Sequence, residues 1–165
     1  MATRTQSDLD RFVANEYPKV VAAVGLITGD RQGAADAVQD AIVGYLSKPP
    51  STPVENLAAW ITVVASNRVR DDYRRKGAES RALAKLGKPT EEVTDAIELL
   101  DIDVKNALEK LPQQQRQVAV LHYLLDQSVE TIAEGLGVTE GTVKTQLSRA
   151  RKSLAAKLRK EDHHD

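Results

Sequence analysis

The 165-residue sequence contains no cysteine. This absence excludes disulfide bonds, thiolate zinc sites and cysteine nucleophiles. Only three histidines are present, and two of them, His163 and His164, lie in a charged tail, so a metalloenzyme would have few ligands. The sequence also lacks an apolar run near the roughly 18 residues that a membrane-spanning helix needs, and the N-terminal segment lacks the apolar core of a signal peptide. We therefore expect a cytoplasmic protein with no membrane insertion.

The residues that are present have the composition of a folded soluble protein, with 41% hydrophobic and 28% charged residues. Glycine and proline cluster at a few points, and alternation of β-branched residues is scarce, so the predicted fold class is all-α. Apolar spacing predicts helices over about 9–28, 33–46 and 54–76. The proline-rich segment 49–53 separates the second helix from the third, because proline cannot continue a helix.

The sequence divides into two small helical domains. Residues 82–139 carry five basic and ten acidic side chains, and the glycine and proline of the 87–90 segment interrupt helical structure. We interpret residues 82–103 as a linker. The first domain would then comprise residues 1–81, the second residues 104–160, and residues 161–165 would form a charged tail.

The formal net charge of -1 conceals two short basic blocks. Residues 66–81 carry six basic and three acidic side chains, and residues 140–160 carry seven basic and one acidic. Such blocks are typical of phosphate binding, although a run of charge is more often a solvated helix face. Each block lies beside an ordered apolar pattern, so we favour a polyanionic partner.

Residues 128–154 have the pattern of a helix-turn-helix. A short helix is expected after Ser128, Gly137 suits the left-handed residue at its end, and Thr139 suits the N-cap of the next helix. That helix has an apolar stripe, formed by Val143, Leu147, Ala150 and Leu154. A polar side carries Lys144, Thr145, Ser148, Arg149 and Lys152. An α-helix fits the major groove of DNA, so we favour DNA binding over an ordinary helical hairpin with a basic exposed face.

The helix expected over 54–76 has a second candidate face, on which Asn67, Arg70, Asp71 and Arg74 share helical spacing. An asparagine among arginines can contact a base edge while the cations hold phosphates. From this segment alone, a core helix whose basic last turn complements the helix dipole is the better explanation. Trp60 is likewise better explained as a core anchor than as a wedge between bases.

Taken together, these segments resemble bacterial RNA polymerase sigma factors of the extracytoplasmic-function (ECF) group, in which region 2 and region 4 are joined by a linker. The resemblance to region 2 lies in residues 28–30, 35–41 and 59–61, with Ala65, Asn67, Asp71, Arg74 and Arg75. The resemblance to region 4 lies in residues 108–112, 115–116, 118, 132–134, 137–138, 141–144 and 148–151. Each segment is modestly specific, and their common order and spacing make the joint match specific.

The resemblance implies three interaction faces. Asp36, Gln39 and Asp40 would dock on the clamp coiled coil of the polymerase β′ subunit, although the residues alone favour a solvated acidic face. Capture of a flipped minus-10 base and its flanking backbone would involve Pro49, Pro50, Ser51, Thr52, Asn56, Asn67, Arg70, Asp71, Arg74 and Arg75. Recognition of the minus-35 element would involve Glu140, Thr142, Lys144, Thr145, Ser148, Arg149 and Arg151.

The partners implied by the resemblance are core RNA polymerase, through its β′ clamp and β flap, and promoter DNA, with an anti-sigma protein as a further candidate. No cofactor is implied, and the sequence has no glycine-rich phosphate loop, metal-ligand cluster or activated nucleophile, so we expect no enzyme. A stand-alone regulator would explain residues 128–154 but not the Asp36, Gln39 and Asp40 face. We expect two modules with separate cores. Each module would bind weakly by itself, and tethering both to polymerase would raise the effective concentration for the second contact.

Overall fold

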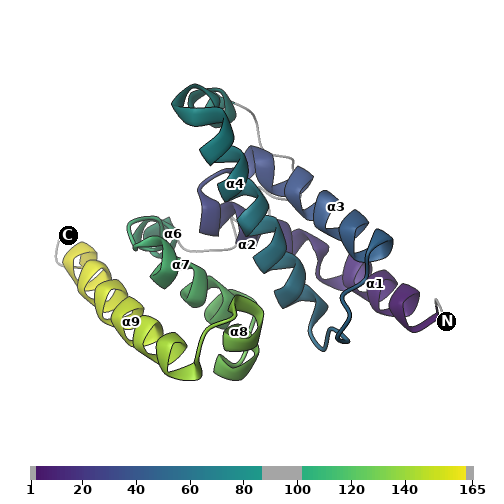
Figure 1. The fold of residues 1–165 in the computed structure, drawn as a ribbon. Coiled ribbons are helices and arrows are strands. Elements are labelled where there is room, and N and C mark those ends of the chain that lie inside the picture. Colours follow the sequence, from purple (N-terminus) through teal and green to yellow (C-terminus); the bar gives the residue numbers. More distant parts are fainter. Residues whose placement is uncertain (1–2, 87–101, 163–165) are drawn as a thin grey trace.

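The computed structural model describes residues 3–86 and 102–162, and every element in these two ranges is a helix (Figure 1). The predicted all-α fold is confirmed. The first module contains α1 (Thr3–Asn15), α2 (Tyr17–Thr28), α3 (Arg31–Ser47) and α4 (Leu57–Leu86). The second contains α6 (Ile102–Glu109), α7 (Gln113–Ala119), the π-helical η1 (Val120–Leu124), α8 (Val129–Leu136) and α9 (Glu140–Asp162). Within the described ranges, no helix combines the length and apolar character needed to cross a membrane.

The helix predicted over 9–28 is in fact two helices. α1 ends at Asn15, Glu16 departs from helical geometry with φ of -122°, and Pro18 lies in the first turn of α2. A proline inside a helix lacks the N–H that the backbone ladder needs, whereas the first turn tolerates it. The prediction of one continuous helix is therefore wrong, and Pro18 is the signal that it missed.

Side-chain caps set the starts of α3 and α4. The Asp30 carboxylate accepts a hydrogen bond from the Gly33 N–H at 2.8 Å, and the Asn56 side-chain oxygen accepts one from the Ala59 N–H at 3.0 Å. α4 then continues to Leu86, ten residues beyond the predicted end, because one glycine inside a helix costs only about 1 kcal/mol. The predicted linker is thus helical at its first residues, and residues 87–101 lie outside the described residues.

α2 is the central helix of the molecule. Its residues from Val20 to Ile27 are all buried, so the helix is apolar around its whole circumference. A helix of this kind must be covered on all sides. α3 and α4 pack against α2 from the first module, and α6, α7 and η1 pack against it from the second.

The second module is built around the predicted helix-turn-helix. The Ser128 hydroxyl caps α8 by accepting from the Thr131 N–H at 3.1 Å. Gly137 ends α8 in the left-handed region with φ of 69°, and Thr139 caps α9 by accepting from the Thr142 N–H at 3.1 Å. The cap and turn predictions for this motif are confirmed.

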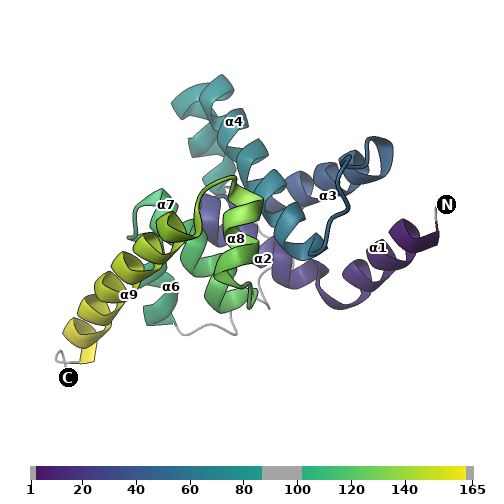
Figure 2. The same cartoon turned by 60° about the horizontal axis from the view of Figure 1, so that its bottom comes forward.

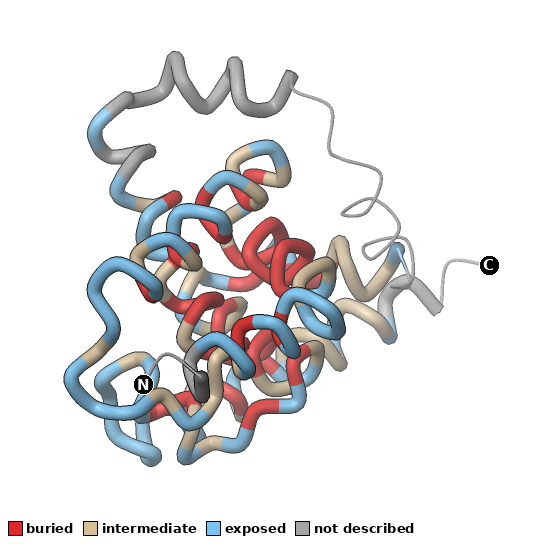
Figure 3. The backbone as a smooth tube through the Cα atoms, turned by 90° about the vertical axis from the view of Figure 1, so that its right-hand side faces the viewer, coloured by how far each residue is buried: buried red, intermediate tan, exposed pale blue. Residues whose placement is uncertain are grey.

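The two modules do not have separate cores. Their buried apolar side chains form one continuous cluster, which passes through α2 into the second module, and α8 also packs against α4. Figure 3 shows the buried stretches of backbone gathered in the interior, with exposed segments around them. The expectation of separate cores is wrong for this arrangement, because α2 has more apolar surface than the first module alone covers.

Candidate nucleic-acid and polymerase interface

The predicted minus-35 face lies on α9, which projects away from the first module (Figure 2). The stripe of Val143, Leu147 and Ala150 is buried against α7 and α8. The opposite side presents six residues of the predicted site as exposed side chains, namely Glu140, Thr142, Lys144, Thr145, Arg149 and Arg151. The seventh, Ser148, is half-buried. The predicted apolar stripe is therefore confirmed as buried at Val143, Leu147 and Ala150, whereas its fourth member, Leu154, is half-buried.

The minus-10 residues predicted from the resemblance divide between a loop and α4. In the loop, Pro49, Ser51 and Thr52 are exposed and Pro50 is half-buried. Asn56 caps α4, so its side-chain oxygen is already engaged by the backbone. This structural role was not anticipated, and the asparagine immediately before the apolar helical run that begins at Leu57 is the sequence signal that indicates it.

On α4, Asn67, Asp71 and Arg75 are exposed and Arg70 is half-buried. The side chain of Arg74 lies outside the described residues. About two turns before Asn67 on the same helix, Trp60 packs against the core. Its ring meets the ring of Tyr45 edge to face, with a centroid distance of 5.6 Å. Trp60 therefore packs against the core as expected, and its half-buried side chain also borders the cavity beside the 50–56 loop.

Two cavities lie between the modules, and both involve predicted DNA-binding residues. The first, of about 280 Å³, lies between the 50–56 loop with Trp60 on one side and α8 residues Thr131, Glu134 and Gly135 on the other. The second, of about 240 Å³, is bounded by α4 and by α7, α8 and α9. Its polar lining is Asn67, Arg70, Gln114, Gln117, Thr142 and Gln146.

The predicted polymerase-docking residues lie exposed on α3. The Gln39 side-chain amide donates to the Tyr17 hydroxyl at 2.9 Å, and the Asp40 carboxylate lies 3.7 Å from the Arg68 guanidinium. Because Tyr17 begins α2 and Arg68 belongs to α4, these contacts place the start of α2 and part of α4 beside the exposed face of α3.

Sequence reasoning missed two apolar members of this α3 face. Val43 and Leu46 are 58% and 48% exposed, and they continue the helical spacing of Asp36 and Gln39 by one and two turns. Exposed apolar side chains bordered by polar ones are typical of a protein-binding surface. The signal was available in the sequence, since neither residue belongs to the apolar stripe that forms the core side of this helix.

Polar contacts join the modules at the end of α2. The Ile27 carbonyl accepts hydrogen bonds from the Gln113 side-chain amide at 3.0 Å and from the Arg116 guanidinium at 3.4 Å. Arg116 also donates to the carbonyls of Glu109 and Leu111, so it ties together the α6–α7 turn. Burial lowers the pKa of the Arg116 guanidinium, and the Glu109 carboxylate partly offsets this effect.

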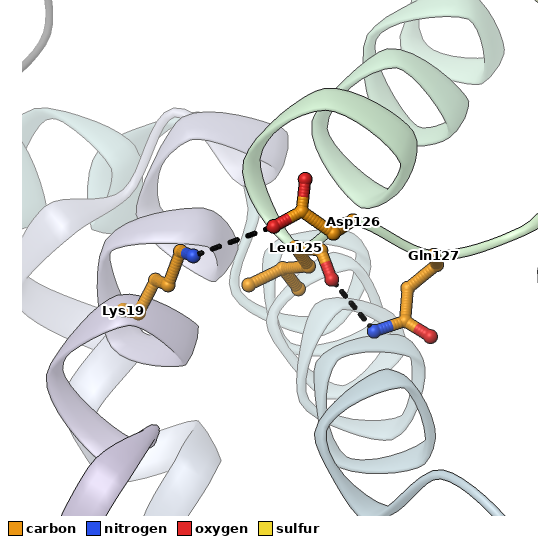
Figure 4. Close-up of polar contacts among 4 residues, drawn as sticks. All are labelled: Lys19, Leu125, Asp126 and Gln127. Carbon is orange, nitrogen blue, oxygen red and sulfur yellow. Dashed lines mark hydrogen bonds and ion pairs between the residues drawn. The ribbon is translucent and has the colours of Figure 1, made fainter.

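A second polar contact joins α2 to the loop after η1 (Figure 4). The Lys19 ammonium lies 4.0 Å from the Asp126 carboxylate, and Asp126 has a left-handed backbone with φ of 54°. The Gln127 side chain donates to the Leu125 carbonyl at 2.8 Å and so holds this turn. Both charged side chains are largely exposed, so the ion pair contributes little to the packing of the modules.

Comparison with known families defines the class of protein. Residues 12–79 match the family model for sigma-70 region 2, and residues 101–154 match that for sigma-70 region 4. The chain is 33% identical over 137 residues to the ECF RNA polymerase sigma factor EcfG of Rhodopseudomonas palustris, covering 80% of this chain and 75% of that protein. It is also 33% identical over 150 residues to SigM of Mycobacterium tuberculosis, covering 90% and 76%.

A solved structure gives the same class. The sigma factor RpoE of Bartonella quintana, crystallised with the anti-sigma factor NepR, superposes with a TM-score of 0.69 and 26% identity, over 92% of this chain and 97% of that one. The chain belongs to the ECF family of RNA polymerase sigma factors. As such it binds core RNA polymerase and promoter DNA and directs promoter-specific initiation of transcription.

Proposed function

We propose that α3 supplies the surface that docks on the β′ clamp. Asp36, Gln39 and Asp40 form its polar part, and Val43 and Leu46 extend it with apolar area. The observation that supports this role is the continuous exposure of these five residues along one side of the helix. Partial desolvation of Val43 and Leu46 would add affinity, and the carboxylates would set the orientation of docking.

The loop before α4 and the exposed side of α4 form the minus-10 site in this proposal. An unstacked base would enter beside Pro50 and Thr52, while Asn67 would contact a base edge and Arg70 and Arg75 would hold the backbone. Asn56 acts by fixing the start of α4, since its oxygen already caps that helix. This placement is supported by the cavity that borders the 50–56 loop.

The first turns of α9 form the minus-35 site. Lys144, Arg149 and Arg151 are exposed, while the opposite stripe of the helix is buried, so the helix can enter a major groove without losing its packing. This separation of a basic side from a buried side is the observation that carries the proposal. The β flap would contact the remainder of the second module.

The proposed domain boundaries, cellular location and regulation follow from these roles. The working domains are residues 1–81 and 104–160, joined by residues 82–103 and followed by the tail 161–165. The chain performs no chemical step itself and acts in the cytoplasm, where polymerase and promoter DNA are found. An anti-sigma protein is a candidate regulator, because the Bartonella relative was crystallised with one.

The test of the proposed function is transcription from a promoter library by core polymerase with and without the chain. We expect starts at promoters that share a minus-10 and a minus-35 element, identified by sequencing the transcripts. Asp40→Arg should lower the affinity for core polymerase, whereas Asp10→Arg, a matched charge reversal on the exposed side of α1, should not. Tight duplex binding without polymerase, together with no promoter-dependent starts, would instead support a stand-alone regulator.

A further inference from the structure

The cavity bounded by α4, α7, α8 and α9 combines buried apolar residues with polar side chains nearer to solvent. Its volume is about 240 Å³. Val63, Val118 and Val143 form the buried apolar lining. Leu136 and Val138 add apolar area, and they are half-buried and 41% exposed. Pockets for drug-sized ligands measure about 300–1,000 Å³, so this cavity suits a smaller molecule, with a single ring or a short chain.

The polar lining of this cavity carries a positive charge and no opposing carboxylate. Among the described residues that line it, Arg70 alone is ionisable. The other polar groups are uncharged donors and acceptors, namely the side-chain amides of Asn67, Gln114, Gln117 and Gln146 and the Thr142 hydroxyl. A cation among apolar and amide groups favours a ligand that has one negative charge.

The cavity beside the 50–56 loop has the opposite character. Glu55 and Glu134 line it, and no lysine or arginine is among its described lining residues. An anion would be repelled there, because like charges repel at short range. The two cavities are of similar size, so charge distinguishes the ligands that each can accept.

Arg70 is available to hold the anionic end of a ligand. It is half-buried, and within residues 3–86 and 102–162 no ion pair or hydrogen bond engages its guanidinium. Arg68, two residues earlier on α4, instead lies 3.7 Å from the Asp40 carboxylate. A partly buried charge is screened less than an exposed one, and the planar guanidinium can bind a carboxylate through two parallel hydrogen bonds.

Gln117 supplies a buried donor that lacks a partner. The residue is 6% exposed, and its Nε2 atom makes no hydrogen bond within the described part of the chain. The terminal torsion of a glutamine side chain is soft, so this amide can turn its N–H groups toward an acceptor in the cavity. Since an unpaired buried donor is unfavourable, an acceptor that pairs with it recovers a lost hydrogen bond.

We propose that this cavity binds a small monocarboxylate with a compact apolar body. The carboxylate pairs with the Arg70 guanidinium and accepts a hydrogen bond from the Gln117 amide. The apolar body lies against Val63, Val118 and Val143, where its burial adds affinity. Binding requires neither DNA nor polymerase, so this activity is additional to the proposed function.

Titration of the purified chain with sodium benzoate tests the proposal, and benzyl alcohol serves as a neutral ligand of similar size. Shifts of the amide signals in ¹H–¹⁵N NMR spectra measure both the affinity and the place of binding. We expect a dissociation constant of about 1 mM for benzoate, in keeping with its few atoms, and the largest shifts at the cavity lining. Benzyl alcohol should bind at least about tenfold more weakly, because it cannot form the charged pair.

Two variants separate the contacts of the ligand. Arg70→Gln should weaken benzoate binding at least about tenfold. Arg68→Gln, which removes the same charge from the same helix outside the cavity, should change it less than about twofold. Gln117→Leu should weaken binding about two- to tenfold and should retain the helical circular dichroism spectrum, since it replaces an unpaired amide by an apolar group of similar volume.

Three results would overturn the proposal. The first is equal affinity for benzoate and benzyl alcohol, and the second is a set of largest shifts away from the cavity lining. The third is wild-type affinity for benzoate in either Arg70→Gln or Gln117→Leu.

Discussion

The two helices proposed to bind DNA, α4 and α9, differ in what fixes them and in how accessible they are. Local caps and a buried stripe define the start of α9, and the helix projects away from the first module (Figure 2). The corresponding side of α4 borders the second module, where Arg70 is half-buried at the interdomain cavity. Under the proposed assignment, minus-35 recognition therefore depends mainly on one helix, whereas minus-10 recognition also depends on where the other module lies.

The largest expected effect concerns the shared core. Ile61 in α4 is fully buried and Leu147 in α9 is 2% exposed, so truncation of either to alanine leaves a cavity. Each should lower the free energy of unfolding by about 2–5 kcal/mol. Because the buried cluster is continuous, chemical denaturation followed by circular dichroism should show one transition for both variants. Two separate transitions would show that the modules unfold independently and would contradict a single shared core.

Arg149 provides the next largest effect. Its side chain is exposed on the polar side of α9, so Arg149→Ala should leave the fold intact. If the guanidinium pairs with a base, use of the minus-35 element should weaken by about 1–3 kcal/mol. The measurement is initiation on promoters with intact and altered minus-35 elements. Arg159→Ala, an exposed charge removal near the end of the same helix, is the control, and equal behaviour of the two variants would remove Arg149 from the site.

Two glycines, one in each module, end a helix with the same left-handed geometry and allow the two modules to be compared directly. Gly29 follows α2 with φ of 77°, and Gly137 follows α8 with φ of 69°. A Cβ at either position would meet no atom within 4 Å, so substitution by alanine costs only backbone strain. Thermal or chemical unfolding should show a loss of about 1–2 kcal/mol for each variant. A much larger loss at one position would reveal a role beyond turn geometry.

The smallest effect is expected for the Lys19–Asp126 ion pair. Its side chains are 57% and 85% exposed, so solvent screens the interaction. Lys19→Ala should change the free energy of unfolding by about 0–1 kcal/mol and should leave the affinity for polymerase nearly unchanged. A loss well above 1 kcal/mol would show that this ion pair contributes more to the packing of the modules than its exposure allows.

The sequence predicted best the elements that local interactions define. Ser128, Gly137 and Thr139 carry the cap and turn signals of the helix-turn-helix, and each adopts the expected geometry. By contrast, the break at Pro18 was missed because the apolar spacing on both sides suggested one helix. The length of α4 was underestimated because Gly77 was interpreted as its end, although a long helix tolerates a single glycine.

The packing of the two modules against each other could not be predicted from local sequence patterns. It depends on contacts such as that between Gln113 and the Ile27 carbonyl, which are 86 residues apart in the sequence. One clue was nevertheless present, since α2 is apolar on every side and therefore needs neighbours all round. On α3, the apolar residues left outside the core stripe, Val43 and Leu46, likewise indicated a surface that binds another protein.

The central claim is that two DNA-binding faces reach separate promoter elements only when polymerase holds them apart. Hydroxyl-radical footprinting of a promoter selected from the library tests this claim most directly. Core polymerase with the chain should protect both the minus-10 and the minus-35 segments, and the chain alone should protect neither. Protection of both segments by the chain without polymerase, or of neither with it, would contradict the account.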